Sequence, residues 1–400
     1  MTRLRRTFTP SSGTGPLPLP AARNVGVMRV AVVTESFLPQ VNGVTNSVLR
    51  VCEQVQRHGG EVLVVAPGRG PAECVGATVV RTPSVPLPGY RDFRLGRPWP
   101  HLARTLRAFS PDVVHLASPA ALGAQAARTA HRLDLPVVAV YQTDLAGFAR
   151  RYGLAGTEAA VWRWLRRVHR DAAVTLAPST AAADDLRRHG VPRVARWGRG
   201  VDTTRFSPQH RCDALRARLA PGGEVLVGYV GRLAHEKEVH LLAHLRGVPG
   251  TRLVVVGDGP QRAALQAQLP GVPFLGLQTG ADLSRAFACL DVFVHTGAAE
   301  TFCQAAQEAK ASGVPVVAPA AGGLLDLVDH GRTGLLFAPG DGDHLRRQVA
   351  LLAADAGARA RMARAAHASV QDRTWDALGD ELLAHYAAAA GARPALGVAA

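Results

Sequence analysis

Short hydrophobic runs alternate with amphipathic stretches along most of this chain. Residues 27–35 read VMRVAVVTE, a compact and largely β-branched run that is typical of a buried parallel strand. Residues 47–60 place apolar side chains on one face of a helix and end in two glycines, which favour a helix stop. A second apolar run follows at 61–68. This strand–helix–strand unit predicts a parallel sheet that is covered by helices on both faces.

The same alternation continues toward the end of the chain and falls into two α/β halves. In the first half, the pattern predicts further strands at 112–119, 136–144 and 174–179 and helices at about 120–132 and 156–171. In the second half, strands are expected at 224–233, 252–260, 272–276, 291–297, 314–323 and 333–341. Periodicity is lost between the halves, near 203–221, where we place the linker.

The pattern therefore predicts an α/β fold of two Rossmann-like domains, at 28–202 and 203–373. A final helix and tail at 374–400 follow the second sheet, and the helix is expected to pack back on the first domain. Residues 1–27 are rich in Arg, Pro, Ser and Gly and lack the apolar core of a secretory signal. They are interpreted either as a disordered extension or as the result of a start codon placed ahead of Met28.

Polar clusters fall where the predicted strands end. In open parallel sheets, ligands bind beyond the carboxyl ends of the strands. Two domains that face each other bring both sets of strand ends into one cleft. We therefore expect a single interdomain site.

Arg232 and Lys237 follow Gly231 at the end of the strand that opens the second half. A forked guanidinium and a compact ammonium near helix N-terminal amides suit a diphosphate, and the glycine permits close backbone approach. Taken alone, the spacing also fits two solvated side chains on a surface turn.

Glu300 and Glu308 stand eight residues apart, slightly over two helical turns, so both carboxylates lie near one side of a helix. Carboxylate oxygens accept hydrogen bonds from sugar or ribose hydroxyls. The alternative is two surface glutamates, but the apolar neighbours indicate burial, where an unpaired carboxylate is costly.

The composition limits the classes of partner. Forty-six Lys and Arg against 31 Asp and Glu give a net charge of +15, which favours nucleic acid, phosphorylated metabolites or an anionic membrane surface. Five scattered cysteines without a C-x-x-C spacing argue against a zinc site or a disulfide framework and favour reduced thiols in the cytoplasm. No apolar run reaches the length of a membrane span.

Several blocks resemble the large retaining glycosyltransferase family 4. Glu300 and Glu308 match its E-x7-E element, VGRLAHEK is similar to its donor-phosphate element, and RGVDTTRFSP resembles its NGVDxxxFxP hinge. The resemblance covers about 28–390. Within the family, ESFLPQVNGVTNSV and neighbouring blocks look most like bacterial GDP-mannose-dependent α-mannosyltransferases that act on glycolipid or phosphatidylinositol acceptors, and plant sulfolipid synthases share the opening block.

The resemblance implies a GT-B fold with an N-terminal acceptor domain and a C-terminal donor domain. Arg232 and Lys237 would stabilise the departing diphosphate, and Gly231 belongs to the same element. Glu308 would hold the nucleotide ribose, and Glu300 would face the donor sugar.

Further positions carry over from the family in the same way. The backbone amides of Phe302 and Cys303 would lie near the donor sugar. Gly43 would let the backbone approach the donor phosphate. His115 and Asp144 would face the transferred sugar or the acceptor.

The chain departs from the family pattern at several positions. Ala117 stands where many relatives carry histidine, Gln142-Thr143 replaces a common His-Thr, and Cys303 stands where glycine is common. The first two departures put the role of His115 in doubt. The alternative for His115 is an inert, hydrogen-bonded core histidine.

The expected chemistry needs no metal and no cofactor. The sequence shows no clear nucleophile for a double displacement, and no D-x-D cluster in a donor-site position. Retention then favours attack from the face that the leaving group vacates, with charge stabilisation supplied by Arg232 and Lys237.

The segment from 156 to 172 interleaves Trp162 and Trp164 with arginines. Such a pattern suits an anionic membrane interface, and it equally fits a domain helix with its apolar side in the core. The expected partners are a nucleoside diphosphate sugar and a lipid acceptor, with no nucleic acid, and the expected location is the cytoplasm, with peripheral membrane contact under the first interpretation. The alternatives are a UDP-sugar-dependent enzyme (glucosyl, N-acetylglucosaminyl or sulfoquinovosyl), a basic nucleic-acid-binding protein and a catalytically silent sugar-nucleotide sensor.

Overall fold

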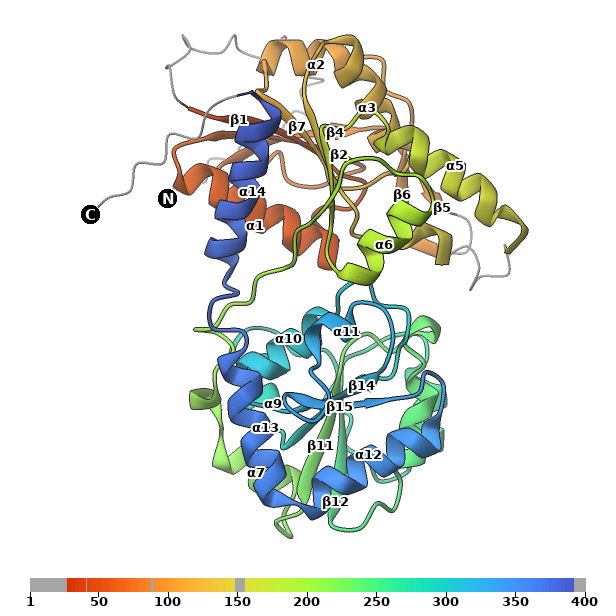
Figure 1. Cartoon of the computed structure of the whole chain (residues 1–400), viewed down its shortest axis with the longest axis vertical. Helices are drawn as coiled ribbons and strands as arrows, with labels where there is room; N and C mark the ends of the chain where they lie inside the picture. Colours follow the sequence, from red (N-terminus) through yellow and green to blue (C-terminus); the bar gives the residue numbers. More distant parts are fainter. Residues whose placement is uncertain (1–26, 41, 88–89, 148–154, 392–400) are drawn as a thin grey trace, which may run out of the picture.

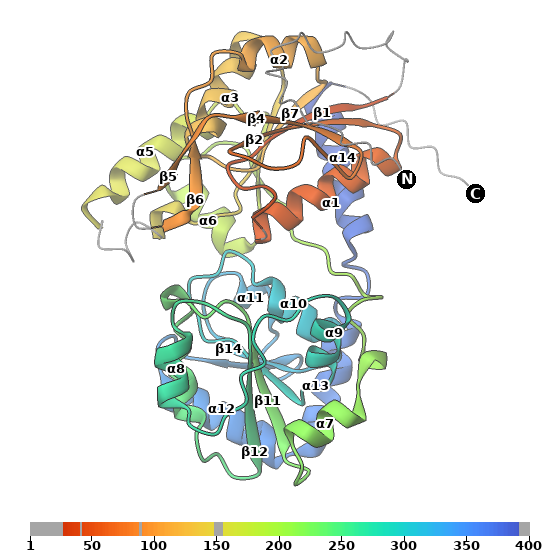
Figure 2. The ribbon, with the colours of Figure 1, turned by 180° about the vertical axis from the view of Figure 1, so that it is seen from behind.

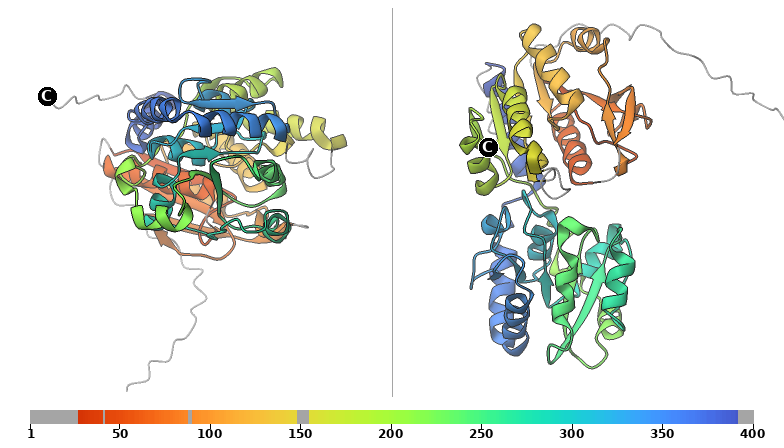
Figure 3. Two further views of the ribbon diagram at one scale, coloured as in Figure 1. Left: turned by 90° about the horizontal axis from the view of Figure 1, so that it is seen from below. Right: turned by 90° about the vertical axis from the view of Figure 1, so that its right-hand side faces the viewer.

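The computed structural model describes residues 27–40, 42–87, 90–147 and 155–391, so most of the predicted N-terminal extension and of the C-terminal tail lies outside the described residues. Two α/β domains lie end to end along the long axis of the molecule (Figures 1 and 3). Each domain is built on its own parallel sheet, as the alternating pattern predicts.

The N-terminal domain holds an eight-stranded sheet in the order β10-β9-β8-β7-β1-β2-β4-β3, in which the pairings are parallel except for β3 with β4. Its strands are β1 (Arg29–Val33), β2 (Glu61–Pro67), β3 (Glu73–Cys74), β4 (Ala77–Thr82), β7 (Val113–Leu116), β8 (Val137–Val140), β9 (Val174–Ala177) and β10 (Val194–Arg196). A separate antiparallel hairpin is formed by β5 (Ser84–Leu87) and β6 (Tyr90–Gly96). The helices are α1 (Gly43–Arg57), α2 (Leu102–Phe109), α3 (Ala121–Arg132), α5 (Glu158–His169) and α6 (Thr180–Arg188).

The C-terminal domain holds a five-stranded, fully parallel sheet in the order β12-β11-β13-β14-β15. Its strands are β11 (Val225–Val230), β12 (Thr251–Val256), β13 (Val292–Val294), β14 (Val316–Pro319) and β15 (Gly334–Phe337). Its helices are α7 (Asp213–Leu219), α8 (Arg262–Gln268), α9 (Gly280–Ala288), α10 (Gln304–Ala311), α11 (Leu324–Leu327), α12 (Gly342–Ala354) and α13 (Ala356–Ala368). Helices α10 and α11 lie on the side that faces the N-terminal domain (Figure 2).

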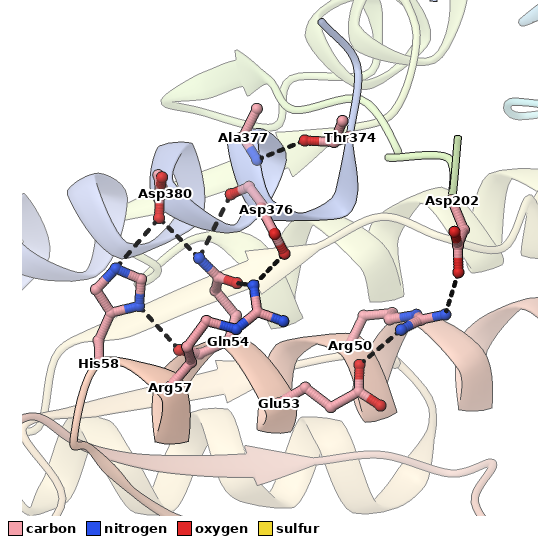
Figure 4. A network of polar contacts seen from close by, with 10 residues as sticks. All are labelled: Arg50, Glu53, Gln54, Arg57, His58, Asp202, Thr374, Asp376, Ala377 and Asp380. Carbon is pink, nitrogen blue, oxygen red and sulfur yellow. Dashed lines mark hydrogen bonds and ion pairs between the residues drawn. The ribbon is translucent and has the colours of Figure 1, made fainter. Parts of the chain in front are cut away.

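The last helix, α14 (Trp375–Ala389), belongs to the N-terminal domain in space. Leu378, Leu382 and Tyr386 are buried in the same hydrophobic cluster as the apolar face of α1. The indole of Trp197 donates a 2.7 Å hydrogen bond to the carbonyl of Leu378. Polar contacts between α1 and α14 border this apolar contact (Figure 4).

The chain crosses between the domains twice, and the two crossing segments touch, with Val201 and Thr374 forming an isolated parallel bridge. The amide of Val201 donates to the carbonyl of Arg373 at 2.8 Å. A Cβ on Gly200 would lie 2.4 Å from the Cα of Trp375, so this close approach requires glycine. The interdomain connection is thus a pair of segments held together by backbone contact.

Two local predictions differ from the structure. Residues 272–276 do not form the expected strand. They pair with β12 only through an isolated bridge between Phe274 and Val255. The element after Lys237 is the 3₁₀ segment Val239–Leu245, so the expected α-helix N-terminus beside Lys237 is wrong. The preceding residue, Glu238, has a positive φ of 48°, which interrupts helical geometry there.

No helix among the described residues has the length and apolar character needed to cross a bilayer. All five cysteines are free thiols.

Candidate active site

The strand ends of the C-terminal domain bring Lys237 and Glu300 together. The Lys237 Nζ lies 2.5 Å from Glu300 Oε1. His295, at the end of β13, places its Nε2 2.9 Å from the same carboxylate oxygen. One half-buried carboxylate therefore lies between an ammonium and an imidazole.

The surroundings shift the pKa values of all three groups. Burial alone would raise the pKa of Glu300, but Lys237 and His295 outweigh it and hold that pKa far below its usual range. Burial would lower the pKa of His295, yet Cys303 and Glu300 together raise it to about 10. Burial likewise opposes the charge on Lys237, and Glu300 more than offsets this, so the pKa of Lys237 is raised. All three shifts favour the charged form of the group, and each is caused mainly by its neighbours in this cluster.

Two close contacts hold the loop of Lys237 against the loop that follows β13. The hydroxyl of Thr296 donates to the carbonyl of Lys237 at 2.6 Å. A Cβ on Gly297 would lie 3.0 Å from the Cα of Lys237, so the loops touch along their backbones. The position of Lys237 is thus set by the loop that leads to Glu300.

Arg232 lies on the loop after β11, and its side chain is exposed. The hydroxyl of Tyr229 donates to the Arg232 carbonyl at 3.0 Å, which fixes the turn. Gly257, at φ 130°, packs against this turn, and a Cβ there would lie 1.9 Å from the Gly231 carbonyl oxygen. Glycine at position 257 is therefore what allows the two strand ends to approach closely at the Gly231 carbonyl.

The loop from Ala298 to Cys303 enters α10 through a left-handed residue. Cys303 has φ 84° and ψ 78°, a conformation that is unfavourable for residues with a Cβ and easy for glycine. This geometry explains physically why glycine suits the position. The side chain of Phe302 is buried in the core of the C-terminal domain, so only its backbone is available to a ligand.

Glu308 lies on the second turn of α10 and is half-buried. Burial raises its pKa to about 8, and Arg205 opposes that shift. No contact of the Glu308 side chain with Lys237 or Glu300 occurs among the described residues, so the structure does not join the two glutamates directly.

The N-terminal domain contributes the start of α1. Gly43 is the first residue of this helix and is exposed. The side chain of Asn42 caps the helix by accepting from the amides of Val44 and Thr45, each at 3.0 Å. Asp144, after β8, is half-buried and accepts from the amide of Gly147 at 2.7 Å.

His115 is placed differently from the expectation that it faces the sugar or the acceptor. It lies on β7 and is 1% exposed. Its Nδ1 is 2.5 Å from the hydroxyl of Tyr386 on α14, and burial lowers its pKa to about 3. The neutral imidazole packs in the core and is closed off from solvent, so this position supports the alternative of a core histidine.

One group of side chains has a donor set that could hold a metal. His295, Glu300 and Cys303 place their ligand atoms within 4.8 Å of one another. The ammonium of Lys237 already occupies one side of that carboxylate, so an ion there would have to compete with it. Nitrogen, oxygen and sulfur donors together would suit zinc better than magnesium.

The sequence matches known glycosyltransferases in both halves of the chain. Residues 41–205 match the model of Glycosyltransferase Family 4, and residues 213–369 match that of glycosyl transferases group 1. A GDP-mannose-dependent alpha-mannosyltransferase of Mycobacterium tuberculosis is 51% identical over 373 residues, which cover 92% of this chain and 98% of that one.

The chain belongs to glycosyltransferase family 4. A further family 4 relative, a GDP-mannose-dependent alpha-mannosyltransferase of Corynebacterium glutamicum, is 47% identical over 90% of this chain and 89% of its own length. Sulfoquinovosyl transferase SQD2 of Arabidopsis thaliana is 33% identical over 87% of this chain and 71% of that one. The assignment makes the protein a glycosyltransferase and replaces the alternative of a nucleic-acid-binding protein.

Solved structures confirm the GT-B fold of this family 4 chain. Anabaena HepE in complex with UDP and glucose superposes with a TM-score of 0.73 at 22% identity, over 90% of this chain and 99% of that one. The lipopolysaccharide glycosyltransferase WaaG superposes with a TM-score of 0.65 at 16% identity, over 88% and 98%.

His295 is the site residue that the sequence reasoning missed. Its signal was present, because the segment DVFVHTG ends a predicted strand with a histidine just before the family 4 E-x7-E element. A strand-end histidine is common, and only the fold shows that this one reaches Glu300.

The raised pKa of Glu308 leads to a prediction about stability and pH. Between its ordinary value of about 4.5 and its folded value of about 8, the native state binds a proton that the unfolded chain has lost. Stability of the wild type should therefore fall as pH rises across this range. Glu308→Gln cannot titrate and should lose that part of the decline.

Thermal unfolding at about pH 5 and about pH 8.5 measures this difference. Glu73→Gln, at an exposed position on β3, is the matched control and should follow the wild type. Parallel pH profiles for Glu308→Gln and the wild type would contradict the prediction.

Proposed function

We propose that this enzyme transfers a mannosyl residue from GDP-mannose, with retention of anomeric configuration, to a lipid-linked acceptor at the cytoplasmic face of a membrane. The observation that carries the donor is the 51% identity to a GDP-mannose-dependent alpha-mannosyltransferase along nearly the whole of both chains. The site geometry is consistent with this donor, because Lys237 and His295 gather at strand ends of the C-terminal domain.

In this proposal, Arg232 and Lys237 stabilise the diphosphate as it departs. Lys237 is neutralised by Glu300 in the structure, and His295 contacts the same oxygen. When the ammonium of Lys237 turns toward the donor phosphates, His295 still compensates the charge of Glu300. The carboxylate therefore stays ionised and able to accept from a sugar hydroxyl.

The remaining roles follow from the family. Glu308 holds the ribose, and its raised pKa means that the carboxyl can donate as well as accept at neutral pH. The amides of Phe302 and Cys303 lie beside the donor sugar, Gly43 admits the donor phosphate, and Asp144 faces the acceptor.

The transfer step proceeds on one face of the sugar. The acceptor hydroxyl oxygen forms a bond to the anomeric carbon as the bond from that carbon to the phosphate oxygen breaks. The departing diphosphate takes the electron pair and the acceptor proton. This mechanism needs positive charge at the leaving group rather than a protein nucleophile.

A UDP-sugar donor is the second candidate. The 33% identity to a sulfoquinovosyl transferase and the fold shared with a glycosyltransferase crystallised with UDP and glucose favour it. A screen of GDP- and UDP-sugars that measures released nucleoside diphosphate decides between the two donors.

Membrane contact is proposed through the arginines of α5. Trp162 and Leu165 are buried in the domain core, and Trp164 donates from its indole to the carbonyl of Pro119 at 2.9 Å. The tryptophans thus do not form an interfacial belt. After its first turn, which exposes Ala159 and Ala160, the exposed residues of α5 are arginines: Arg163, Arg166, Arg167 and, just past the helix end, Arg170.

The first prediction from this proposal concerns the diphosphate. Arg232→Ala or Lys237→Ala should lower kcat/KM at least about 100-fold, because each change removes charge stabilisation on the order of 3 kcal/mol. Arg262→Ala, which removes an arginine paired with Asp258 in the same domain, is the control. Near-normal turnover of either test variant with GDP-mannose would rule out the assigned role.

The second prediction concerns metal. Lys237 occupies the carboxylate that a metal would need, so treatment with EDTA should leave the rate of nucleoside diphosphate release unchanged. Loss of activity that is restored by added magnesium, manganese or zinc would contradict the leaving-group mechanism.

The third prediction concerns the membrane. Changing the four α5 arginines together to Gln should weaken binding to anionic vesicles strongly, since each basic contact contributes about 1 kcal/mol near such a surface. The effect should shrink as salt rises. Activity on a short-chain, detergent-soluble acceptor should remain.

Vesicle flotation measures the binding. The matched control removes four exposed arginines from the C-terminal domain, at Arg285, Arg332, Arg361 and Arg364. If the α5 variant floats as well as this control, the α5 arginines are solvated side chains of an ordinary domain helix.

A further inference from the structure

Arg199 lies in the segment that connects the two domains and is only 8% exposed. Its Nη1 donates to the carbonyl of Gly43 at 3.2 Å. Its Nη2 donates to the Oε1 of Gln142 at 2.9 Å. The guanidinium is therefore anchored to two loops at the carboxyl edge of the N-terminal sheet.

Within the described part of the chain, this buried cation has no carboxylate within ion-pair distance. No ion pair of Arg199 occurs among residues 27–40, 42–87, 90–147 and 155–391, and its two side-chain hydrogen bonds go to neutral oxygens. Burial lowers the pKa of Arg199 to about 10, and the charge of Glu300 only partly offsets this. A guanidinium out of water without a counter-ion is costly, and proteins normally pair it with an anion.

The donor domain also reaches this position. The amide of the Gln307 side chain donates to the Arg199 carbonyl at 2.7 Å. The hydroxyl of Thr301, next to Glu300, donates to the Gln142 carbonyl at 3.3 Å. Arg199 thus sits where the loop that carries Glu300 meets the N-terminal domain.

The sequence points to the same group of residues. Arg199 stands at the asparagine of the NGVD element, and Gln142 stands at the histidine of the common His-Thr pair. The Gln142 side chain also approaches the carbonyl of Ala117 at 3.5 Å, and Ala117 is another position that departs from the family pattern. Arg199 therefore lies beside two positions, Gln142 and Ala117, where this chain departs from that pattern.

We propose that Arg199 is a donor-binding residue of the N-terminal domain, whose guanidinium binds the diphosphate of the nucleotide sugar from the side opposite Arg232 and Lys237. This role rests on the proposed function, since it needs a nucleoside diphosphate in the cleft. The diphosphate supplies the missing counter-charge, and Gly43 and Gln142 hold the guanidinium in place for it.

A purely structural role makes a different prediction. As a strut between Gly43 and Gln142, Arg199 would contribute to folding, and its loss would affect every ligand equally. As a diphosphate ligand, it contributes to the binding of phosphorylated ligands and leaves the nucleoside alone unaffected.

Calorimetric titration of the full chain with GDP and with guanosine tests the proposal. Arg199→Gln removes the charge but keeps an amide that can hydrogen-bond, and it should weaken GDP binding roughly 10- to 100-fold. Arg199→Lys should recover part of that loss, because it restores the charge without the fork. Guanosine should bind both variants as it binds the wild type.

Arg50→Gln is the matched control. Arg50 lies on α1 near the same interdomain segment, but its charge is already paired with Glu53 at 2.8 Å and Asp202 at 3.6 Å (Figure 4). GDP affinity should be unchanged in this variant. Thermal unfolding establishes beforehand that each variant is folded.

Unchanged GDP affinity in folded Arg199→Gln overturns the proposal, and so does an equal loss for GDP and guanosine. If the wild type binds UDP and not GDP, the proposed donor is wrong, and the same titrations with UDP and uridine still test Arg199. The two failures are therefore distinguishable.

Discussion

The contact of the Glu300 carboxylate with Lys237 and His295 is the interaction on which this cluster depends. The two partners of the half-buried carboxylate follow different strands of the C-terminal domain. Removing either cation would leave an incompletely paired charge in a largely buried setting, which is costly. The same ion cluster sets where Lys237 lies, and thereby where a phosphate can be bound. One group of contacts thus orders these loops and gathers their charges, and the loops lie so close that a Cβ at position 297 would be only 3.0 Å from the Cα of Lys237.

Much of the fold was predictable because it follows from local patterns. Parallel strands that are buried on both faces produce apolar runs such as residues 27–35, and the E-x7-E spacing is visible as a family 4 motif. Non-local facts were out of reach. Nothing near His115 in the sequence indicates that Tyr386 will cover it, and nothing near His295 identifies its carboxylate partner. The apolar spacing after Lys237 fits an α-helix and a 3₁₀ helix, so the sequence alone does not indicate that Val239–Leu245 is a 3₁₀ segment.

Charge illustrates the same limit. The excess of positive charge correctly indicated anionic ligands, but it could not say which arginines serve them. In space, many arginines of this chain pair with a carboxylate a turn away, as Arg187 does with Asp184 and Arg285 with Asp282. Arg199 differs because it is buried and its side chain donates to two neutral oxygens. The number of arginines in the sequence therefore does not identify a ligand-binding arginine. Its burial and its lack of a carboxylate partner among the described residues do.

The position of α14 has a consequence for how the protein is made. The core of the N-terminal domain includes Leu378, Leu382 and Tyr386, which are synthesised after the whole C-terminal domain. The N-terminal domain is translated before the C-terminal domain, but it can complete its core only after α14 has been made. The apolar face that α14 covers therefore stays exposed while the C-terminal domain is translated. The N-terminal domain thus comes first in the sequence but completes its core last. A fragment that ends at the linker lacks α14 and therefore part of the core of its domain.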